Sequence, residues 1–203
     1  CILRLYRCAQ RPHNGHSATT AMAQVSLGTF VVKGATVQPM QSDLRIDAPR
    51  YVVWDALSDI RTVVAWNPGI DDVECLSEQT TGLGARRRCF THPSGWMTES
   101  ITEWDEGTSI AFSVEDAPPL KNGVARFGLR DDHEGTRLTA SFDYELKLGP
   151  IGPVIDRLVV HRQLSAAWSR GLEGLKDYTE DQWRTAGATN SRTSTYTERE
   201  NTQ

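Results

Sequence analysis

A single long helical pattern near the C-terminus constrains the fold of this chain more than any other feature. It covers residues 152–180, has Pro153 in its first turn and contains no later proline. Proline is tolerated at the start of a helix but not in its interior, so the pattern is compatible with one uninterrupted helix. We therefore expect one helix over the whole of this segment.

One face of this predicted helix combines apolar and polar side chains. Residues spaced by three and four share a helix face, and here they are Leu158, His161, Ser165, Trp168, Leu172 and Leu175. The apolar ones would each contribute about 1.5 to 3 kcal/mol when buried against a sheet. His161 and Ser165 would face the same sheet without filling the space beside it, which predicts a cavity. The alternative is a closed core in which both polar side chains are hydrogen-bonded.

The middle of the chain has the pattern of an antiparallel sheet. Short stretches of alternating apolar and polar residues follow one another, separated by turns that contain Gly or Pro. Such a series is typical of strands joined by short connections. Six strands are expected, over residues 70–78, 85–92, 96–104, 109–115, 124–131 and 136–148.

A further strand and two short helices are expected before this series. Residues 35–47 have a strand-like pattern that ends before Pro49, because the residue preceding a proline is displaced from helical geometry. Apolar residues between Tyr51 and Leu57 predict a first short helix, and residues 60–66 a second. This order predicts an α+β fold with a seven-stranded antiparallel sheet, two short helices and a long C-terminal helix.

Two charged residues fall on the expected inner face of the sheet. Strand alternation places Phe112, Phe127 and Tyr144 on that face. The same face of the third strand in the series includes Glu99, and in the strand before it the alternation favours Arg87. Glu99 is therefore expected to be either a buried, protonated carboxyl group or the ion-pair partner of a buried arginine such as Arg87.

Composition excludes some classes of partner. The 203-residue chain carries a formal net charge of -4, whereas nucleic-acid-binding domains usually have a basic surface. No apolar run approaches the roughly 20 residues that span a bilayer, and no secretory signal is recognisable. We therefore expect a cytoplasmic protein that binds no nucleic acid and has no transmembrane segment.

The spacing of cysteine and histidine residues does not predict a metal site. Cys1, Cys8, Cys75 and Cys89 include no Cys-x-x-Cys pair, and no histidine lies at the spacing of a zinc motif. In an intracellular protein such residues are expected to be reduced, partly buried thiols. Neither a metal nor a cofactor is expected.

Both ends of the chain lack the pattern of a packed domain. Residues 1–34 have no sustained hydrophobic period and begin with Cys rather than Met, so we expect a disordered or non-native extension. Residues 181–203 are rich in Thr, Ser, Asn, Arg and Glu, which predicts a disordered tail. The folded domain is expected to cover residues 35–180.

Several short motifs occur where the predicted elements begin and end. They are Ile46-Asp47-Ala48-Pro49, Val53-Trp54-Asp55-Ala56-Leu57-Ser58-Asp59, Trp66-Asn67-Pro68, Gly84-Ala85-Arg86-Arg87, Glu99-Ser100-Ile101-Thr102-Glu103-Trp104-Asp105 and Gly135-Thr136-Arg137-Leu138. With the order of elements, they resemble the START-like, helix-grip superfamily, in particular its polyketide cyclase/dehydrase branch (SRPBCC). The resemblance covers about residues 35–178 and includes no catalytic signature. It implies a curved sheet that grips the C-terminal helix around a pocket for a hydrophobic or amphipathic small molecule.

Side chains from the inner sheet face and the long helix would line this pocket. His161 is a candidate for a ligand contact or for general acid or base catalysis. Together with Glu99 and Tyr144 it would form the kind of proton-transfer set that a cyclase needs. The expected ligand-contacting residues are Trp66, Arg87, Glu99, Phe112, Phe127, Tyr144, Leu158, His161 and Ser165.

Three tryptophans are candidates for the mouth of the pocket. Trp54, Trp66 and Trp96 would form an aromatic wall there, and Trp66 is favoured because it ends the second short helix. The alternative is that all three belong to the hydrophobic core.

Binding without catalysis is the favoured function. Most expected inner positions are apolar and few polar groups converge, which suits burial of a lipid, polyketide or aromatic ligand. A polyketide cyclase or dehydratase acting in the same cavity is the first alternative. A protein-interaction module, in which the helix docks a protein partner, is the second.

Overall fold

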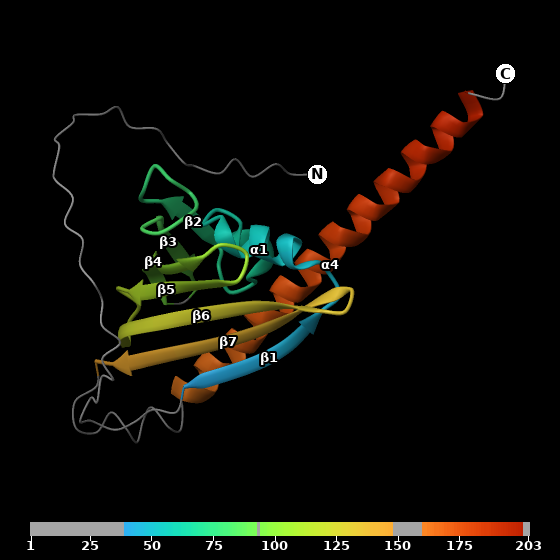
Figure 1. Ribbon diagram of the computed structural model, residues 1–203. Helices are drawn as coiled ribbons and strands as arrows, with labels where there is room; N and C mark the ends of the chain where they lie inside the picture. The colour runs from blue at the N-terminus through green and yellow to red at the C-terminus, as the bar shows by residue number, and fades with distance from the viewer. Residues whose placement is uncertain (1–38, 93, 148–159, 201–203) are drawn as a thin grey trace.

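The described chain forms one antiparallel sheet crossed on one face by a long helix (Figure 1). The computed structural model describes residues 39–92, 94–147 and 160–200, and the side chains of the last helix as far as residue 187. The elements are β1 (Met40–Ile46), α1 (Arg50–Ser58), α2 (Val63–Trp66), β2 (Asp72–Cys75), β3 (Arg86–Thr91), β4 (Gly95–Asp105), β5 (Ser109–Glu115), β6 (Leu120–Asp132), β7 (Gly135–Leu146) and α4 (His161–Glu200). The predicted α+β architecture, with a seven-stranded sheet, two short helices and a long C-terminal helix, is confirmed.

The strands follow one another across the sheet in chain order, except at one edge. The order is β1-β7-β6-β5-β4-β3-β2, so the first strand lies beside the last, with Leu44 opposite Leu138. The connection from β1 to β2 therefore spans the width of the sheet, and α1 and α2 lie within it. Both short helices pack against α4.

Strand alternation separates an apolar inner face from a polar outer face. Phe112, Phe127 and Leu138 are buried on the inner face, as predicted, whereas Arg126 and Arg130 are exposed on the outer one. The inner face forms one hydrophobic core with side chains of α1, α2 and α4.

Strand β6 begins earlier than predicted. Asn122 and Gly123, which were expected in a turn, lie inside this strand and pair with β7. A Cβ atom at Gly123 would lie 2.9 Å from the ring of Phe142. Gly123 therefore leaves room for an aromatic ring on the inner face instead of forming a turn.

Helix α4 extends further than predicted. Residues 181–200, expected in a disordered tail, are helical, because the hydrogen bonds of a helix are local and need no apolar stripe. Arg184 and Asp181, one turn apart, form an ion pair of 2.7 Å. The side chains of residues 181–187 are exposed, and Figure 1 shows this part of α4 projecting beyond the sheet. The predicted start of the helix at residue 152 lies outside the described residues.

The middle of α4 is held close to the two short helices and to β1. Leu172 and Leu175 are buried there. A Cβ atom at Gly174 would lie 2.1 Å from the carbonyl oxygen of Trp66, so only glycine permits this approach of α4 to α2. Lys176 Nζ donates a hydrogen bond of 2.9 Å to the carbonyl oxygen of Arg45 at the end of β1.

Candidate functional site

A row of aromatic rings occupies the space between the inner sheet face and α4. Neighbouring ring centroids are separated by 6.1 Å for Phe112 and Phe127, 5.6 Å for Phe127 and Trp168, 5.7 Å for Trp168 and Phe142, 5.8 Å for Phe142 and Tyr144, and 6.5 Å for Tyr144 and His161. Trp168 is the member that α4 contributes to the middle of the row. Its ring plane lies 28° from that of Phe127 and 19° from that of Phe142, so it stacks on both.

A small cavity lies at the Phe112 end of this row. Its volume is about 70 Å³. Side chains from α2, from the inner sheet face and from α4 enclose it, and most of them are apolar. The lining residues are Val63, Trp66, Asn67, Ile70, Arg87, Glu99, Phe112, Ala125, Phe127, Ala167, Trp168, Gly171 and Leu172.

Arg87 and Glu99 form a buried ion pair beside the cavity. They are directly opposite each other on β3 and β4, and Arg87 Nε donates to Glu99 Oε2 at 2.6 Å. Arg87 Nη1 also donates to the carbonyl oxygen of Ile60 at 2.9 Å, and its guanidinium carbon lies 5.0 Å from the centre of the Phe112 ring. Of the two alternatives expected for Glu99, the structure shows the ion pair with a buried arginine. The contacts of Arg87 with Ile60 and Phe112 help to hold the pair in place.

Electrostatics favour a charged arginine and a neutral thiol at this position. Burial lowers the pKa of Arg87, but the adjacent Glu99 carboxylate outweighs this effect and the pKa is raised above its usual value. Burial, reinforced by Glu99, raises the pKa of the Cys89 thiol far above its usual value. The Cys89 Sγ atom lies 3.4 Å from Glu99 Oε2, which gives the carboxylate a second neighbour. The cluster can present a fixed positive charge and a hydrogen-bond acceptor to a ligand, but Cys89 is not a nucleophile at neutral pH.

A second group of polar side chains lies near the start of α4. It consists of Tyr144 on β7 and of His161 and Ser165 on α4. The hydroxyl group of Tyr144 lies 3.1 Å from His161 Nδ1, within hydrogen-bonding distance. Ser165 Oγ donates to Met40 Sδ at 3.1 Å. Helix geometry places His161 about 9 Å along the axis from Ala167, the first residue of α4 that lines the cavity. None of these three polar side chains lines the cavity beside Arg87 and Glu99.

The structure divides the residues predicted to contact a ligand into two groups. Trp66, Arg87, Glu99, Phe112 and Phe127 line the cavity. Tyr144, His161 and Ser165 are not among its lining residues, and Leu158 lies outside the described residues. Glu99 bonds to Arg87, whereas Tyr144 contacts His161, so the three candidates for proton transfer are not brought together as one set.

The tryptophans considered for the pocket mouth have different environments. Trp66 lines the cavity, is itself buried and donates from Nε1 to the carbonyl oxygen of Ala56 at 3.0 Å. Trp54 is buried against Trp104 in the core. Trp96 is exposed and packs on Phe90. These three residues do not form a common wall.

Sequence reasoning missed several lining residues on α2 and α4. Trp168 was expected only to anchor the helix on the sheet, and Asn67 only to end the second short helix. Gly171, whose added Cβ would lie 3.3 Å from the Asn67 amide, was not considered. A signal was present, because two glycines three residues apart, Gly171 and Gly174, are unfavourable in a helix interior and indicate close packing of another backbone.

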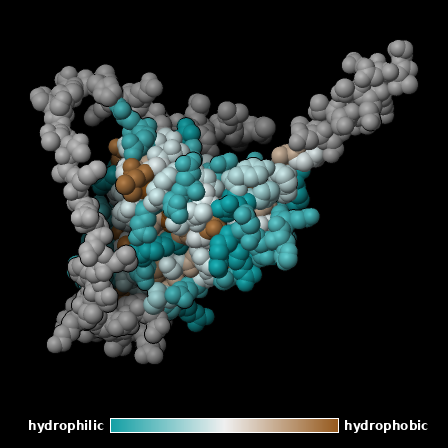
Figure 2. All heavy atoms as spheres, viewed as in Figure 1, coloured by the Kyte–Doolittle hydropathy of each residue, from teal (hydrophilic) through white to brown (hydrophobic). Residues whose placement is uncertain are grey.

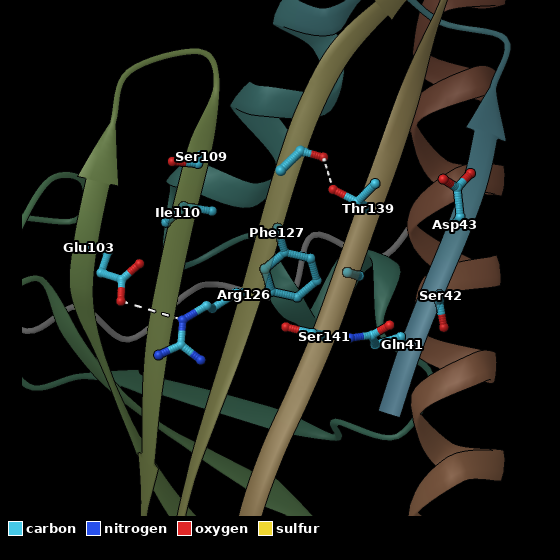
Figure 3. A pocket seen from close by; sticks show the side chains of 12 residues that line it. Gln41, Ser42, Asp43, Glu103, Ser109, Ile110, Arg126, Phe127, Thr139 and Ser141 are labelled. Atoms are coloured by element: carbon cyan, nitrogen blue, oxygen red, sulfur yellow. Dashed lines mark hydrogen bonds and ion pairs between the residues drawn. The ribbon is translucent and has the colours of Figure 1, made fainter. Parts of the chain in front are cut away.

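A larger hollow of about 550 Å³ lies on the outer face of the sheet (Figure 3). It crosses β1, β7, β6, β5 and β4, and its charged side chains are already paired. Arg126 contacts Glu103 at 3.4 Å and Asp143 at 2.9 Å, and Arg137 contacts Asp43 at 2.5 Å. These ion pairs are about half exposed and offer no aromatic face to a ligand. Figure 2 shows that this side of the molecule is mainly hydrophilic, so the inner cavity is the better candidate site for an apolar ligand.

The described residues contain neither a metal-binding cluster nor a membrane-spanning helix. Over residues 39–92, 94–147 and 160–200, no group of His, Cys, Asp and Glu side chains is arranged to hold a metal ion. In the same part of the chain, no helix is both long and apolar enough to cross a membrane.

The curved sheet, the long helix and the cavity between them define a START-like, helix-grip protein. Residues 40–180 match the family described as polyketide cyclase / dehydrase and lipid transport, and the chain belongs to this family. Among curated proteins, none matches the sequence significantly.

Solved structures support the same fold at low sequence identity. The Zhui aromatase/cyclase from Streptomyces sp. R1128 is 22% identical with a TM-score of 0.64, over 74% of this chain and 98% of that one. A START superfamily protein from Mycobacterium smegmatis is 17% identical with a TM-score of 0.55, over 73% and 98%. A protein from Thermus thermophilus is 18% identical with a TM-score of 0.57, over 70% and 96%. At these identities the likeness shows the fold alone.

Proposed function

We propose that this protein binds a hydrophobic or amphipathic small molecule, such as a lipid, polyketide or aromatic compound, between the sheet and α4. The observation that carries the proposal is a buried ion pair at the edge of a mainly apolar cavity. Among the described residues that line the cavity, Arg87 and Glu99 alone carry charge. An apolar ligand would bind by burial, and one oxygen-containing group on it would hydrogen-bond to this pair.

Family membership supports the same assignment at a coarser level. The family description includes both lipid transport and polyketide chemistry. Both involve molecules that combine a large apolar surface with a few oxygen atoms. An aromatic cavity with one polar corner suits such molecules, and it does not by itself imply a reaction.

Binding can be tested with a matched pair of substitutions on α4. Ala166 and Ala167 are adjacent and exposed, but only Ala167 lines the cavity. With 2-naphthol as the probe, Ala167→Phe should weaken binding about tenfold or more by obstructing the cavity, whereas Ala166→Phe should leave the affinity unchanged. Isothermal titration calorimetry would measure both. If 2-naphthol binds neither the wild type nor any variant, the proposal is wrong.

The natural ligand can be sought directly. Protein purified without detergent should carry a small molecule that is released by organic extraction and identified by mass spectrometry. The Ala167→Phe protein should carry less of it than the Ala166→Phe protein. Equal amounts in the two samples would indicate binding elsewhere on the surface.

A cyclase or dehydratase is the second candidate, and one contact favours it. Tyr144 and His161 lie 3.1 Å apart beside the aromatic row, so a proton donor and a proton acceptor are adjacent. In a cyclisation through an enolate, a base removes a proton next to a carbonyl group and an acid protonates the oxygen that becomes negatively charged. The two side chains have the chemistry for these roles.

Deuterium exchange of a model diketone tests the catalytic alternative. If the pair is catalytic, the wild type should accelerate exchange at the central carbon of benzoylacetone in D₂O, followed by NMR, and His161→Asn and Tyr144→Phe should each lower the rate at least about tenfold. His133→Asn is the control, since His133 is exposed in the turn after β6. No acceleration by the wild type above buffer would leave only the binding function.

A further inference from the structure

We propose that the side chain of Trp168 closes the cavity when no ligand is bound and moves away from the sheet when a ligand binds. The proposal rests on the binding function above and assigns the residue that controls access to that site. It predicts that Trp168 limits the size of the ligand. It also predicts that the free protein is mainly closed.

The cavity is small for a ligand-binding pocket. Pockets for small molecules usually have volumes of about 300 to 1,000 Å³. The cavity here has a volume of about 70 Å³, enough for about two water molecules. A lipid or aromatic ligand therefore cannot occupy it unless a neighbouring side chain moves.

Trp168 occupies the space next to the cavity. Its indole ring lines the cavity and stacks on Phe127 and Phe142. Moving this ring away would join the cavity to the space along the aromatic row. The faces of Phe127 and Phe142 would then be free to stack on a ligand.

Trp168 is held less firmly than the other large residues that line the cavity. It is only half-buried, whereas Phe112, Phe127 and Trp66 are buried. Its Nε1 atom donates to Ser42 Oγ at 3.3 Å, beyond the usual range for such a bond. The corresponding bond of Trp66 to Ala56 is 3.0 Å long.

The position of Trp168 on α4 gives a route for the movement. The preceding residue, Ala167, is exposed and also lines the cavity. The lining therefore reaches the surface next to Trp168. A rotation of its side chain about the Cα–Cβ and Cβ–Cγ bonds, with no change in the helix, is sufficient to open the cavity there.

The stacked rings also indicate the shape of ligand that best replaces Trp168. An indole ring is flat and bicyclic, and its planes lie within 28° of the two rings that it contacts. A flat ligand of similar size can recover the same stacking, but a flexible chain cannot. We expect 2-naphthol, a flat bicyclic alcohol, to bind more tightly than 1-decanol.

The affinity test compares two tryptophan variants on the same helix. Trp168→Ala should bind 2-naphthol at least about tenfold more tightly than the wild type, because the closed state that competes with the ligand is lost. Trp183→Ala is the matched control, since Trp183 is exposed and contacts Tyr51 away from the cavity. It should bind like the wild type. Circular dichroism would check that each variant is folded, and Trp168→Phe replaces Trp168→Ala if the latter is not.

A second measurement follows the side chain itself. With 5-fluorotryptophan at all six tryptophan positions, ¹⁹F NMR gives one resonance for each, and Trp168→Phe identifies the one from Trp168. Saturation of the wild type with 2-naphthol should move this resonance to the position of a solvent-exposed indole. The resonance of Trp183 should not move.

The possible outcomes separate the two proposals. Tighter binding by Trp168→Ala, or by Trp168→Phe in its place, with a shifted Trp168 resonance supports the closing role. If the wild type binds 2-naphthol while its Trp168 resonance stays in place and the variant binds no more tightly, the closing role is wrong and the binding function stands. If 2-naphthol and 1-decanol bind neither to the wild type nor to the Trp168 variant, both proposals are wrong.

Discussion

At the scale of single residues, Arg87 and Glu99 form an ion pair in the interior of the protein. Both are nearly inaccessible to solvent, and they meet because strand pairing places them opposite each other. Removing two ions from water costs free energy that their attraction only partly returns. We therefore expect the pair to add little net stability to the fold, which fits the proposed role in contacting a ligand.

A double-substitution cycle tests this explanation. Arg87→Met or Glu99→Leu alone should lower the free energy of unfolding by about 3 to 5 kcal/mol, because each leaves an unpaired buried charge. The double variant should be about as stable as the wild type. Urea denaturation of the four proteins would measure this. A double variant that is as unstable as the single variants would show that the pair stabilises the fold.

The same double variant tests the role of the pair in binding. The wild type should prefer 2-naphthol to naphthalene, because only 2-naphthol has a hydroxyl group for the pair. The double variant should bind both probes equally, as measured by competitive titration. An unchanged preference would place the polar group of the ligand elsewhere.

At the scale of elements, the distance between α4 and the rest of the fold depends on two glycines. Gly171 lies against the amide of Asn67, and Gly174 against the carbonyl oxygen of Trp66. These contacts fix one part of α4 next to α2. The part that carries Trp168 is spaced from β6 and β7 by aromatic rings.

Alanine substitutions at two glycines of α4 should have opposite effects. Alanine favours a helix over glycine by about 1 kcal/mol, but at Gly174 it would collide with the Trp66 backbone, so Gly174→Ala should destabilise by about 1 to 3 kcal/mol. At Gly187 the described residues place no atom within 4 Å of the added Cβ, apart from the helix backbone beside it, so Gly187→Ala should be neutral or slightly stabilising. Thermal denaturation followed by circular dichroism would compare them. A stabilising Gly174→Ala would mean that α4 does not approach α2 so closely.

The contact of α4 with the end of β1 should depend on pH. Glu180 Oε1 accepts hydrogen bonds from the backbone N–H of Asp47, at 2.8 Å, and from Lys176. Partial burial raises the pKa of Glu180, but the Asp47 N–H and the positive charges of Lys176 and Arg184 outweigh it, so the pKa is lowered. The unfolded carboxyl group binds protons more readily, so this contribution to stability is present above the unfolded value of about 4.3 and is lost as pH falls through the lower folded value.

Glu180→Gln tests this dependence. The variant should be less stable than the wild type at neutral pH, by about 1 kcal/mol, and the difference should disappear in acid. Urea denaturation at about pH 7 and about pH 3 would measure it. Glu173→Gln, on the exposed side of α4, should be nearly neutral. A Glu180→Gln difference that persists unchanged in acid would rule out the ionised carboxylate as its source.

At the scale of the whole molecule, the sheet and the helices packed on it bury side chains, whereas residues 181–187 at the projecting end of α4 bury none. Limited proteolysis with trypsin should cut this end before it cuts the sheet, after Arg192 or Arg199, because residues 181–187 already contribute no buried side chain and an isolated helical end frays. Mass spectrometry of a time course should then show a fragment that retains residues 40–180. Early cuts between β2 and β7 would contradict this arrangement.

The sequence by itself determined the elements of this protein and the faces of its strands. Both follow from local periods, in which alternate strand residues share a face and helix residues spaced by three and four share a stripe. This is why Arg87 and Glu99 could be predicted on the inner face, and why their pairing was one of two stated alternatives. It was also enough for the predicted resemblance to a family that residues 40–180 match.

Only the tertiary structure decided where the cavity lies and which side chains fill the rest of the space between the sheet and α4. The polar residues His161 and Ser165 predicted a cavity at their own positions, but Tyr144 and Met40 contact them, and the described cavity lies further along α4. Its position depends on the close approach of Gly174 to Trp66 and on the direction of the Trp168 ring. These are distances and rotamers set by contacts between residues far apart in the chain, and a local pattern of polarity contains no information about them.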